Sequence, residues 1–275
     1  MALDADVIVV GGAVAGLAVA NALGHVGVRT LVIEKGPERD NSTRGDILHP
    51  PTLRFLARWG VLEELHRDGA LPMRHIAVSH QHLGRVATYD VPSQGDGPAG
   101  RSLAVPHDRI EAVMKGCAAR WPSVSIERAM AVDLERDERG RVCGARARTG
   151  DQERVFRAPL VVGCDGMNSM VRRRLGIDVE QHRYGHRLVF GTAEGPTDPP
   201  AAMHFHLSDR VVLVANRPRS MMRVAIRFEP GEGRYLIRQP DPLLHDFVRE
   251  RVPPLDSVRF LGSDVHVYPI VRQLA

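Results

Sequence analysis

The first 35 residues constrain the fold of this sequence more than any other segment. Residues 6–10, Asp-Val-Ile-Val-Val, lead into Gly11, Gly12, Ala13, Val14, Ala15 and Gly16, and a helical stretch then precedes residues 30–35, Thr-Leu-Val-Ile-Glu-Lys. Buried strands favour β-branched residues, and a turn that brings backbone amides to a phosphate needs positions without a Cβ. The pattern predicts a strand, a glycine turn, a helix and a second strand.

Glu34 closes the second strand, about 20 residues beyond the glycines. A βαβ unit that binds an adenine dinucleotide places a carboxylate there, on the ribose hydroxyls. We therefore expect an adenine dinucleotide rather than a buried βα unit without a ligand. The carboxylate also argues against NADP at this position, because it would repel the 2′-phosphate.

Ala13 departs from the pattern G-x-G-x-x-G, which has glycine at this position. The added methyl group narrows the approach to a pyrophosphate. We expect a small shift of the turn at Gly12 to compensate, with the amides of Val14 and Ala15 free for the anion at the start of the helix.

The composition is that of a globular chain, with 275 residues and 43% hydrophobic content. Residues 7–22 carry no charge, but Asp4 and Asp6 precede them and glycines interrupt them, so we expect no export signal and no membrane span. Three widely spaced cysteines suit a reducing compartment, which predicts a cytoplasmic location.

The formal net charge is +4, and only two of the 37 basic residues are lysines. The densest basic run, residues 172–174, follows Ser169 at helical spacing and has no interleaved aromatic residues. We therefore expect no nucleic-acid partner. An anionic cofactor or substrate accounts equally well for the mild positive charge.

Further along the chain, helical periodicity covers residues 52–65, with a break near Gly60, and residues 107–119. Strands are predicted within residues 75–91, 124–133, 142–148 and 158–162, with a loop at 92–101 and a hairpin turn at 137–140. From residue 179 onward, segments 188–191, 202–207, 211–215 and 222–228 predict a mostly antiparallel sheet. A helix over 243–252 and a strand region over 258–269 complete the prediction.

A second strand, turn and helix begins at residue 158 and contains Gly163-Cys164-Asp165-Gly166, then Asn168, Ser169 and Arg172. Together with the N-terminal glycine segment, Glu34 and the Arg44 segment before Leu-His-Pro, this motif resembles the class A FAD-dependent monooxygenases. These are aromatic hydroxylases with the p-hydroxybenzoate hydroxylase fold. In the family, the Asp-Gly pair with its downstream Ser and Arg serves the binding of both FAD and the nicotinamide.

The resemblance implies an α/β fold, with a Rossmann-like FAD-binding domain of the GR2 type and a mostly antiparallel-sheet substrate domain. We expect residues 1–74 and 106–178 to form the first domain and residues 75–105 and 179–275 the second. By the same resemblance Glu34 would hold the ribose and Lys35 would be a further cofactor-binding residue. Arg44 and Arg109 would contact the FAD phosphates or the flavin side, and Val132 would lie near the adenine. Asp165 and Gly166 would organise the pyrophosphate region.

The family also carries a third motif, Gly-Asp followed by small residues and His, after the substrate-domain sheet. Residues 268–270, Tyr-Pro-Ile, resemble the strand before it. We therefore expect the chain to lack this motif and the helix that follows. It is then either a fragment of a longer enzyme or a shortened member that binds FAD poorly.

The implied activity is hydroxylation of an electron-rich aromatic small molecule by a flavin C4a-hydroperoxide, with FAD as cofactor, NAD(P)H as transient reductant and O2 as co-substrate. The catalytic residues stay unassigned, although His206 or Tyr184 could deprotonate a phenol. Substrate contacts are expected from the sheet residues Met203, Phe205, His206 and Met222, without a decision on which face is inward. His204-x-His206 and His80-x-His82 have metal-compatible spacing, but no cysteine or carboxylate completes either pair, so we expect no metal.

Three alternatives remain open. The chain could be a truncated or partner-dependent flavin-fold module without activity alone. It could be an FAD-dependent reductase or dehydrogenase that does not insert oxygen. An NAD-dependent dehydrogenase shares the first βαβ unit but gives no reason for the Cys164-Asp165-Gly166 segment.

Overall fold

The structure is a computed structural model that describes residues 2–36, 46–95, 97–196, 202–229, 246, 248, 250–252, 258–261 and 266–274. Its first unit is a four-stranded parallel sheet in the order β12-β1-β2-β8. The strands are β1 (Val7–Val10), β2 (Thr30–Glu34), β8 (Val124–Arg128) and β12 (Leu160–Gly163), and helix α1 (Val14–His25) connects β1 to β2. The predicted βαβ unit is therefore confirmed.

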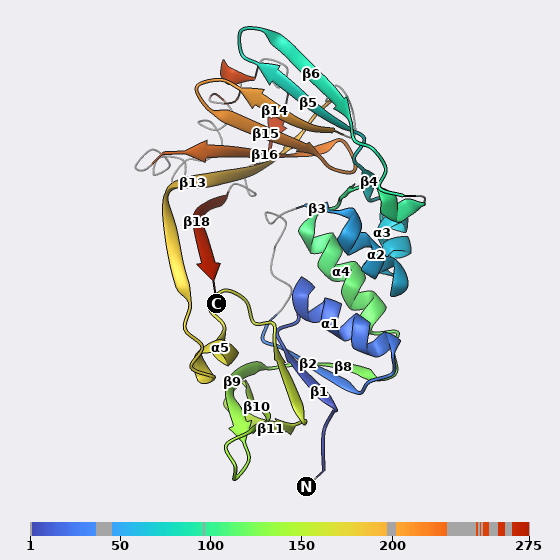
Figure 1. Cartoon of the computed structure of the whole chain (residues 1–275), viewed down its shortest axis with the longest axis vertical. Helices are drawn as coiled ribbons and strands as arrows, with labels where there is room; N and C mark the ends of the chain where they lie inside the picture. Colours follow the sequence, from blue (N-terminus) through green and yellow to red (C-terminus); the bar gives the residue numbers. More distant parts are fainter. Residues whose placement is uncertain are drawn as a thin grey trace.

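Helices cover one side of this sheet (Figure 1). They are α1, α2 (Pro50–Arg58), α3 (Val61–Arg67) and α4 (His107–Ala118). The predicted break near Gly60 is present, because Gly60 has φ +72 and separates α2 from α3. Short strands β3 (Ile47–Leu48), β4 (Leu71–Pro72) and β7 (Leu103–Ala104) form a small sheet between these helices and the rest of the molecule, and η1 (Pro98–Gly100) lies in the predicted loop.

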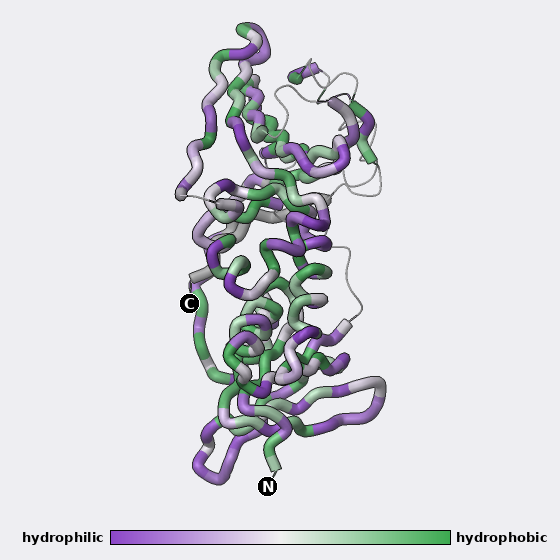
Figure 2. Tube along the Cα trace, turned by 90° about the vertical axis from the view of Figure 1, so that its right-hand side faces the viewer, coloured by the Kyte–Doolittle hydropathy of each residue, from purple (hydrophilic) through white to green (hydrophobic). Residues whose placement is uncertain are grey.

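A three-stranded antiparallel sheet packs at the opposite side. It contains β9 (Met130–Arg136), β10 (Val142–Thr149) and β11 (Gln152–Arg157), and the predicted hairpin turn joins β9 to β10. The single strand predicted over 124–133 is two strands, β8 and β9, which belong to different sheets. Helix α5 (Met170–Arg174) follows β12. The loops at the N-terminal end of the molecule are largely hydrophilic (Figure 2).

Apart from the two-residue strand β7, the strands of the two segments predicted to form the substrate domain belong to one eight-stranded sheet. Its path is β17-β13-β16-β15-β14-β5-β6, and β18 pairs with β13 outside this path. The strands are β5 (His75–His80), β6 (Gly84–Asp90), β13 (Glu180–Glu194), β14 (Ala202–Leu207), β15 (Val211–Asn216), β16 (Met221–Phe228), β17 (Arg259–Phe260) and β18 (His266–Leu274). Every pair is antiparallel except β14 with β5, which confirms the mostly antiparallel prediction. The helix predicted over 243–252 lies mostly outside the described residues.

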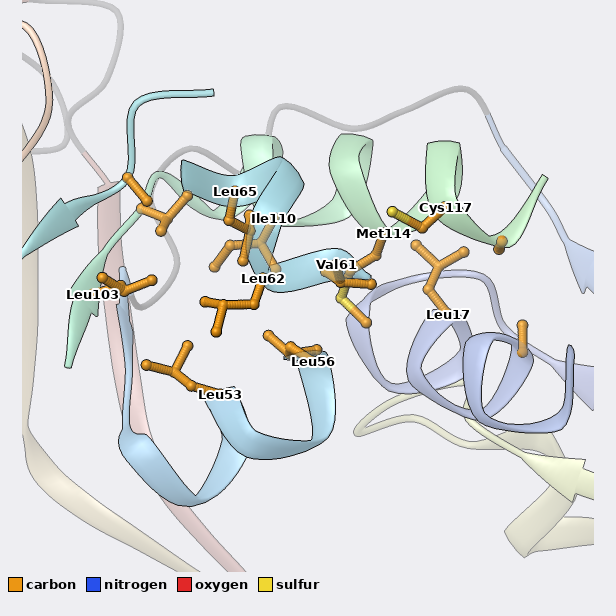
Figure 3. Close-up of a cluster of buried hydrophobic side chains, with 14 of the residues drawn as sticks. Leu17, Leu53, Leu56, Val61, Leu62, Leu65, Leu103, Ile110, Met114 and Cys117 are labelled. Carbon is orange, nitrogen blue, oxygen red and sulfur yellow. The ribbon is translucent and has the colours of Figure 1, made fainter. Parts of the chain in front are cut away.

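Two long strands connect the regions. β13 runs from the eight-stranded sheet down toward α5, and β18 lies beside it (Figure 1). The largest hydrophobic cluster lies between the parallel sheet and helices α1 to α4, where leucines of α1, α2 and α3 meet Ile110, Met114 and Cys117 of α4 (Figure 3). A second cluster covers one face of the eight-stranded sheet, and a third lies between the parallel sheet and the β9–β11 sheet.

Candidate functional site

The glycine turn after β1 is built from close backbone contacts. Gly11 has φ +102, and a Cβ there would lie 2.4 Å from the carbonyl oxygen of Cys164. A Cβ on Gly16 would lie 1.7 Å from the carbonyl oxygen of Gly11. Both residues are glycine because the turn packs against its own helix and against the end of β12, which brings the two sequence motifs together.

Ala13 is the N-cap of α1, with φ −80 and ψ −172. This is extended backbone that any residue adopts, so the fold accepts a methyl group where the pattern has glycine. The Ala13 side chain offers no cap to the helix, and the first turn holds no acidic residue. The amides of the first turn, including those of Val14 and Ala15, are therefore left for an anion, which the helix dipole also favours.

Glu34 ends β2 at the glycine turn, as predicted. Its carboxylate oxygen Oε2 accepts a hydrogen bond of 2.6 Å from the Gly12 amide, and a Cβ on Gly12 would lie 2.9 Å from the Cβ of Glu34. A carboxylate next to an uncapped helix N-terminus is the donor and acceptor set that a ribose and a pyrophosphate require. The neighbouring Lys35 is exposed.

Asp165 holds the turn that follows β12. Its carboxylate accepts hydrogen bonds from the Ser169 hydroxyl (2.5 Å), the Met170 amide (2.5 Å) and the Val171 amide (3.2 Å). Gly166 has φ +82, which favours glycine. Asp165 thus fixes the start of α5 beside the glycine turn, and its contact with a pyrophosphate stays a prediction.

The other predicted cofactor residues are spread more widely. Arg109 lies on α4 and forms a two-armed ion pair with Asp68, and the Arg109 hydrogen bond holds the pKa of Asp68 below its usual range. Val132 lies on β9, in the neighbouring antiparallel sheet, and is half-buried. Arg44 lies outside the described residues. The structure thus brings together residues 11–16, Glu34 and the Asp165 turn, whereas Arg109 is engaged elsewhere.

A cavity of about 300 Å³ lies between α1, α2 and α4. Its lining is apolar and includes Val14, Phe55 and Trp59. The cavity touches the first turn of α1 but contains none of the polar groups of the glycine turn. It therefore supplies no carboxylate or amide that could orient a dinucleotide.

The predicted substrate residues lie on two opposite faces of the eight-stranded sheet. Strand register places Met203 beside Ala215 and then Arg223, and Arg223 contacts Asp46 just before β3. This face, which also holds Phe205, points toward helices α1 to α4, because β3 belongs to the small sheet beside them (Figure 1). Met203 and Phe205 are half-buried there. We call the parallel sheet with these helices, which is expected to bind FAD, the FAD-binding region.

His206 and Met222 lie on the other face, which the second hydrophobic cluster covers. Met222 is 0% exposed and belongs to that cluster, and His206 is 7% exposed. Burial and, to a lesser extent, the nearby charges of His204 and Arg85 lower the pKa of His206 to about 4. The four residues therefore do not line one pocket, and the alternation of side chains along β14 is the reason.

His204 stacks on His206, with ring centroids 6.0 Å apart, and its Nε2 lies 3.3 Å from the side-chain oxygen of Asn216. The ring centroids of His80 and His82 lie 5.7 Å apart at the end of β5. Among the described residues, no group of three or more His, Cys, Asp or Glu side chains could hold a metal ion. Tyr184 is partly exposed and lies on β13 against His182.

The structure also contains a buried ionic network that was not predicted from the sequence. Asp46 accepts hydrogen bonds from Arg217 (2.7 Å) and Arg223 (3.0 Å), and the Thr192 hydroxyl accepts from both arginines at 3.2 and 3.4 Å. Asp46 is separated from the arginines by more than 170 positions. No local pattern indicates such a pairing, although Asp46 stands in the segment quoted for the family resemblance.

Several known hydroxylases are similar in sequence to this chain. The 3-(3-hydroxy-phenyl)propionate/3-hydroxycinnamic acid hydroxylase of Comamonas testosteroni is 24% identical over 295 residues, which cover 97% of this chain and 49% of the hydroxylase. The chain spans about half the length of the curated relatives that it matches from end to end. Within the described residues, no helix has the length and apolar character needed to cross a membrane.

Two solved structures share the fold. The p-nitrophenol 4-monooxygenase of Pseudomonas putida superposes with a TM-score of 0.83 at 22% identity, covering 100% of this chain and 70% of that one. Aklavinone-11 hydroxylase, solved with FAD and aklavinone, has a TM-score of 0.78 at 20% identity and covers 100% and 55%. A family model described as an FAD binding domain matches residues 4–242. The chain therefore belongs to the FAD-binding-domain family of class A flavin monooxygenases, which have the p-hydroxybenzoate hydroxylase fold.

Proposed function

We propose that this chain binds FAD at the glycine turn and serves the hydroxylation of an electron-rich aromatic small molecule, with NAD(P)H as reductant and O2 as co-substrate. The observation that carries the proposal is the Glu34 carboxylate, which lies 2.6 Å from the Gly12 amide beside the uncapped start of α1. FAD, when bound, supplies the redox and oxygen-transfer chemistry. The protein residues bind it, orient the substrate and exclude water.

Each part of the site has a distinct role in this proposal. The first-turn amides of α1 hold the pyrophosphate, and Glu34 holds the adenosine ribose. The substrate lies against the face of the eight-stranded sheet that carries Met203 and Phe205. That face supplies half-buried apolar surface, which suits an aromatic ring better than a highly charged one.

The relatives support the reaction class. The Comamonas protein is named as a hydroxylase of a hydroxyphenyl compound, and the aklavinone hydroxylase structure contains FAD with its substrate. We extend an aromatic substrate and FAD to this chain on that basis. A cytoplasmic location remains part of the proposal, and it is supported by three free cysteines, Cys117, Cys143 and Cys164.

The test is the visible absorbance of the purified chain after incubation with FAD and desalting. We expect protein-bound flavin bands near ~375 and ~450 nm. Glu34→Gln should weaken FAD binding by about tenfold, because a neutral amide binds the ribose hydroxyls less strongly than a carboxylate. Glu63→Gln is the matched control, since Glu63 is an exposed glutamate on α3. Equal FAD affinity in both variants would refute the assignment of Glu34.

A second candidate is a flavin-fold module that binds FAD but turns over only with a partner or further sequence. This chain covers about half the length of the hydroxylases that it matches, which favours this candidate. An FAD-dependent reductase is the third. Substrate-dependent incorporation of labelled oxygen identifies the hydroxylase, peroxide formation without incorporation identifies the reductase, and retained FAD without NAD(P)H oxidation identifies the module.

A further inference from the structure

The Asp46 network connects two regions of the molecule. The backbone carbonyl of Asp46 accepts a hydrogen bond from the Val105 amide (2.7 Å), next to the small β3-β7-β4 sheet. Its side chain reaches the eight-stranded sheet instead, where one carboxylate oxygen binds Arg217 and the other binds Arg223. In Figure 1, β3 lies directly below that sheet. One residue thus joins the helical side of the FAD-binding region to the sheet that faces it.

The arginines flank a strained hairpin turn between β15 and β16. Arg219 and Ser220 have φ values of 63 and 58, which non-glycine residues rarely adopt. Such a turn persists only where its surroundings fix it. The Arg217 amide donates to the Met221 carbonyl at 2.8 Å, and the Gly195 amide donates to the Ser220 carbonyl at 3.1 Å. The hydrogen bond from Arg109 and, to a lesser extent, the charge of Arg219 lower the pKa of Asp68, a carboxylate of the helical side.

Burial decides what this network does. The side chains of Asp46, Arg217 and Arg223 are 3%, 4% and 5% exposed. At that depth they do not reach a substrate on the surface of the sheet, so direct binding is not their role. Strand pairing nevertheless places Arg223 and Met203 on the same face of the sheet, the face that points to the FAD-binding region.

We propose that Asp46, Arg217 and Arg223 form an interdomain clamp that sets the position of the substrate-facing sheet relative to the FAD-binding region. They act as positioning residues. Their effect on hydroxylation rests on the proposed function, whereas the clamp itself does not. Asp46 directly precedes β3 and is also bonded through its backbone to Val105. The clamp therefore ties the small sheet beside helices α1 to α4 to the sheet that carries Met203 and Phe205.

Amide hydrogen exchange of the chain without FAD provides a readout that is independent of the cofactor. In Asp46→Asn we expect exchange to rise by about tenfold or more in two separate regions at once, residues 46–48 with 103–105 and the hairpin at 216–221. Asp46→Glu should recover part of the protection because it keeps the charge. Asp6→Asn is the matched control, since it removes an exposed carboxylate that pairs with Arg29.

FAD titration then separates positioning from general stability. We expect Asp46→Asn to weaken FAD binding by about tenfold, whereas Val212→Ala, which destabilises the covered face of the same sheet, should leave FAD affinity unchanged. If Asp46→Asn does not fold, Arg223→Lys tests the same contact, because lysine keeps the charge but has no two separate nitrogens with which to bridge Asp46 and Thr192.

Exchange that rises in only one of the two regions, or in neither, would overturn the clamp. An Asp46→Asn variant with wild-type FAD affinity would overturn its link to the cofactor site. If the wild-type chain binds no FAD, the proposed function fails, while the exchange experiment still decides whether the clamp exists.

Discussion

At the scale of single residues, Gly16 is the least replaceable position of the glycine turn. An added Cβ would lie 1.7 Å from the Gly11 carbonyl oxygen, which is backbone and cannot rotate away. We expect Gly16→Ala to lower the free energy of unfolding by about 2–4 kcal/mol in urea titrations. Gly116→Ala on α4, where no heavy atom lies within 4 Å, should instead stabilise the chain by about 0.5–1 kcal/mol. A similar effect of both substitutions would contradict the packing described for the turn.

His206 gives the stability of the fold a dependence on pH. Its pKa of about 4 in the fold lies below the ordinary value of 6.5, so the unfolded chain takes up a proton before the folded chain does. The stability associated with neutral His206 is present above about pH 6.5 and is lost as the pH falls toward 4. Between pH 7 and 4.5 the loss should be about 2 kcal/mol.

Urea unfolding at both pH values checks this, with His206→Gln as the variant. The variant should lose about 2 kcal/mol less than the wild type over the same interval, because glutamine does not titrate. His25→Gln, at an exposed helix end, serves as the control. An identical pH dependence of all three chains would show that His206 is protonated equally in the folded and unfolded states.

At the scale of elements, α5 has only five residues and depends on Asp165 for its start. Removing the carboxylate in Asp165→Ala leaves the Met170 and Val171 amides without that acceptor, and we expect a loss of about 1–2 kcal/mol in unfolding free energy. Asp165→Asn keeps one acceptor oxygen and should lose less. Asp151→Ala, in an exposed turn, is the control. If FAD affinity falls in Asp165→Asn while stability does not, the carboxylate contacts the cofactor rather than only capping α5.

Elements with a strong local pattern could be predicted from the sequence. The β1-α1-β2 unit, the break at Gly60 and the hairpin after Arg136 follow from glycine positions and apolar periodicity. The two-residue strands β3, β4 and β7 could not, because their pairing is set by tertiary contacts. The separation of β8 from β9 was missed because a single strand-like segment without glycine or proline passes from one sheet to the other at Ala129.

At the scale of the whole molecule, the relation between distant segments was the part hidden from sequence. Glu34 at the glycine turn was predictable, since the family spacing is local to one βαβ unit. Alternation along β14 alone separates Met203 from His206, but which of the two faces is inward required the register of β14 with β15 and β16. The Asp46 network required the position of a hairpin more than 170 residues away. Local patterns specify the cofactor turn, whereas long-range register specifies which residues meet the substrate.

The clamp predicts how the molecule unfolds. Both tryptophans, Trp59 and Trp121, lie beside the helices of the FAD-binding region, so their fluorescence reports on that region, whereas far-UV circular dichroism reports on all sheets. With the clamp intact we expect the two thermal transitions to coincide. FAD at about 100 times its Kd should raise both by about 5–10 °C, since binding adds about 2.7 kcal/mol. In Asp46→Asn, FAD should raise the temperature of the fluorescence transition but not that of the circular dichroism transition. A wild-type chain in which only the fluorescence transition responds would mean that the eight-stranded sheet unfolds independently of the cofactor site.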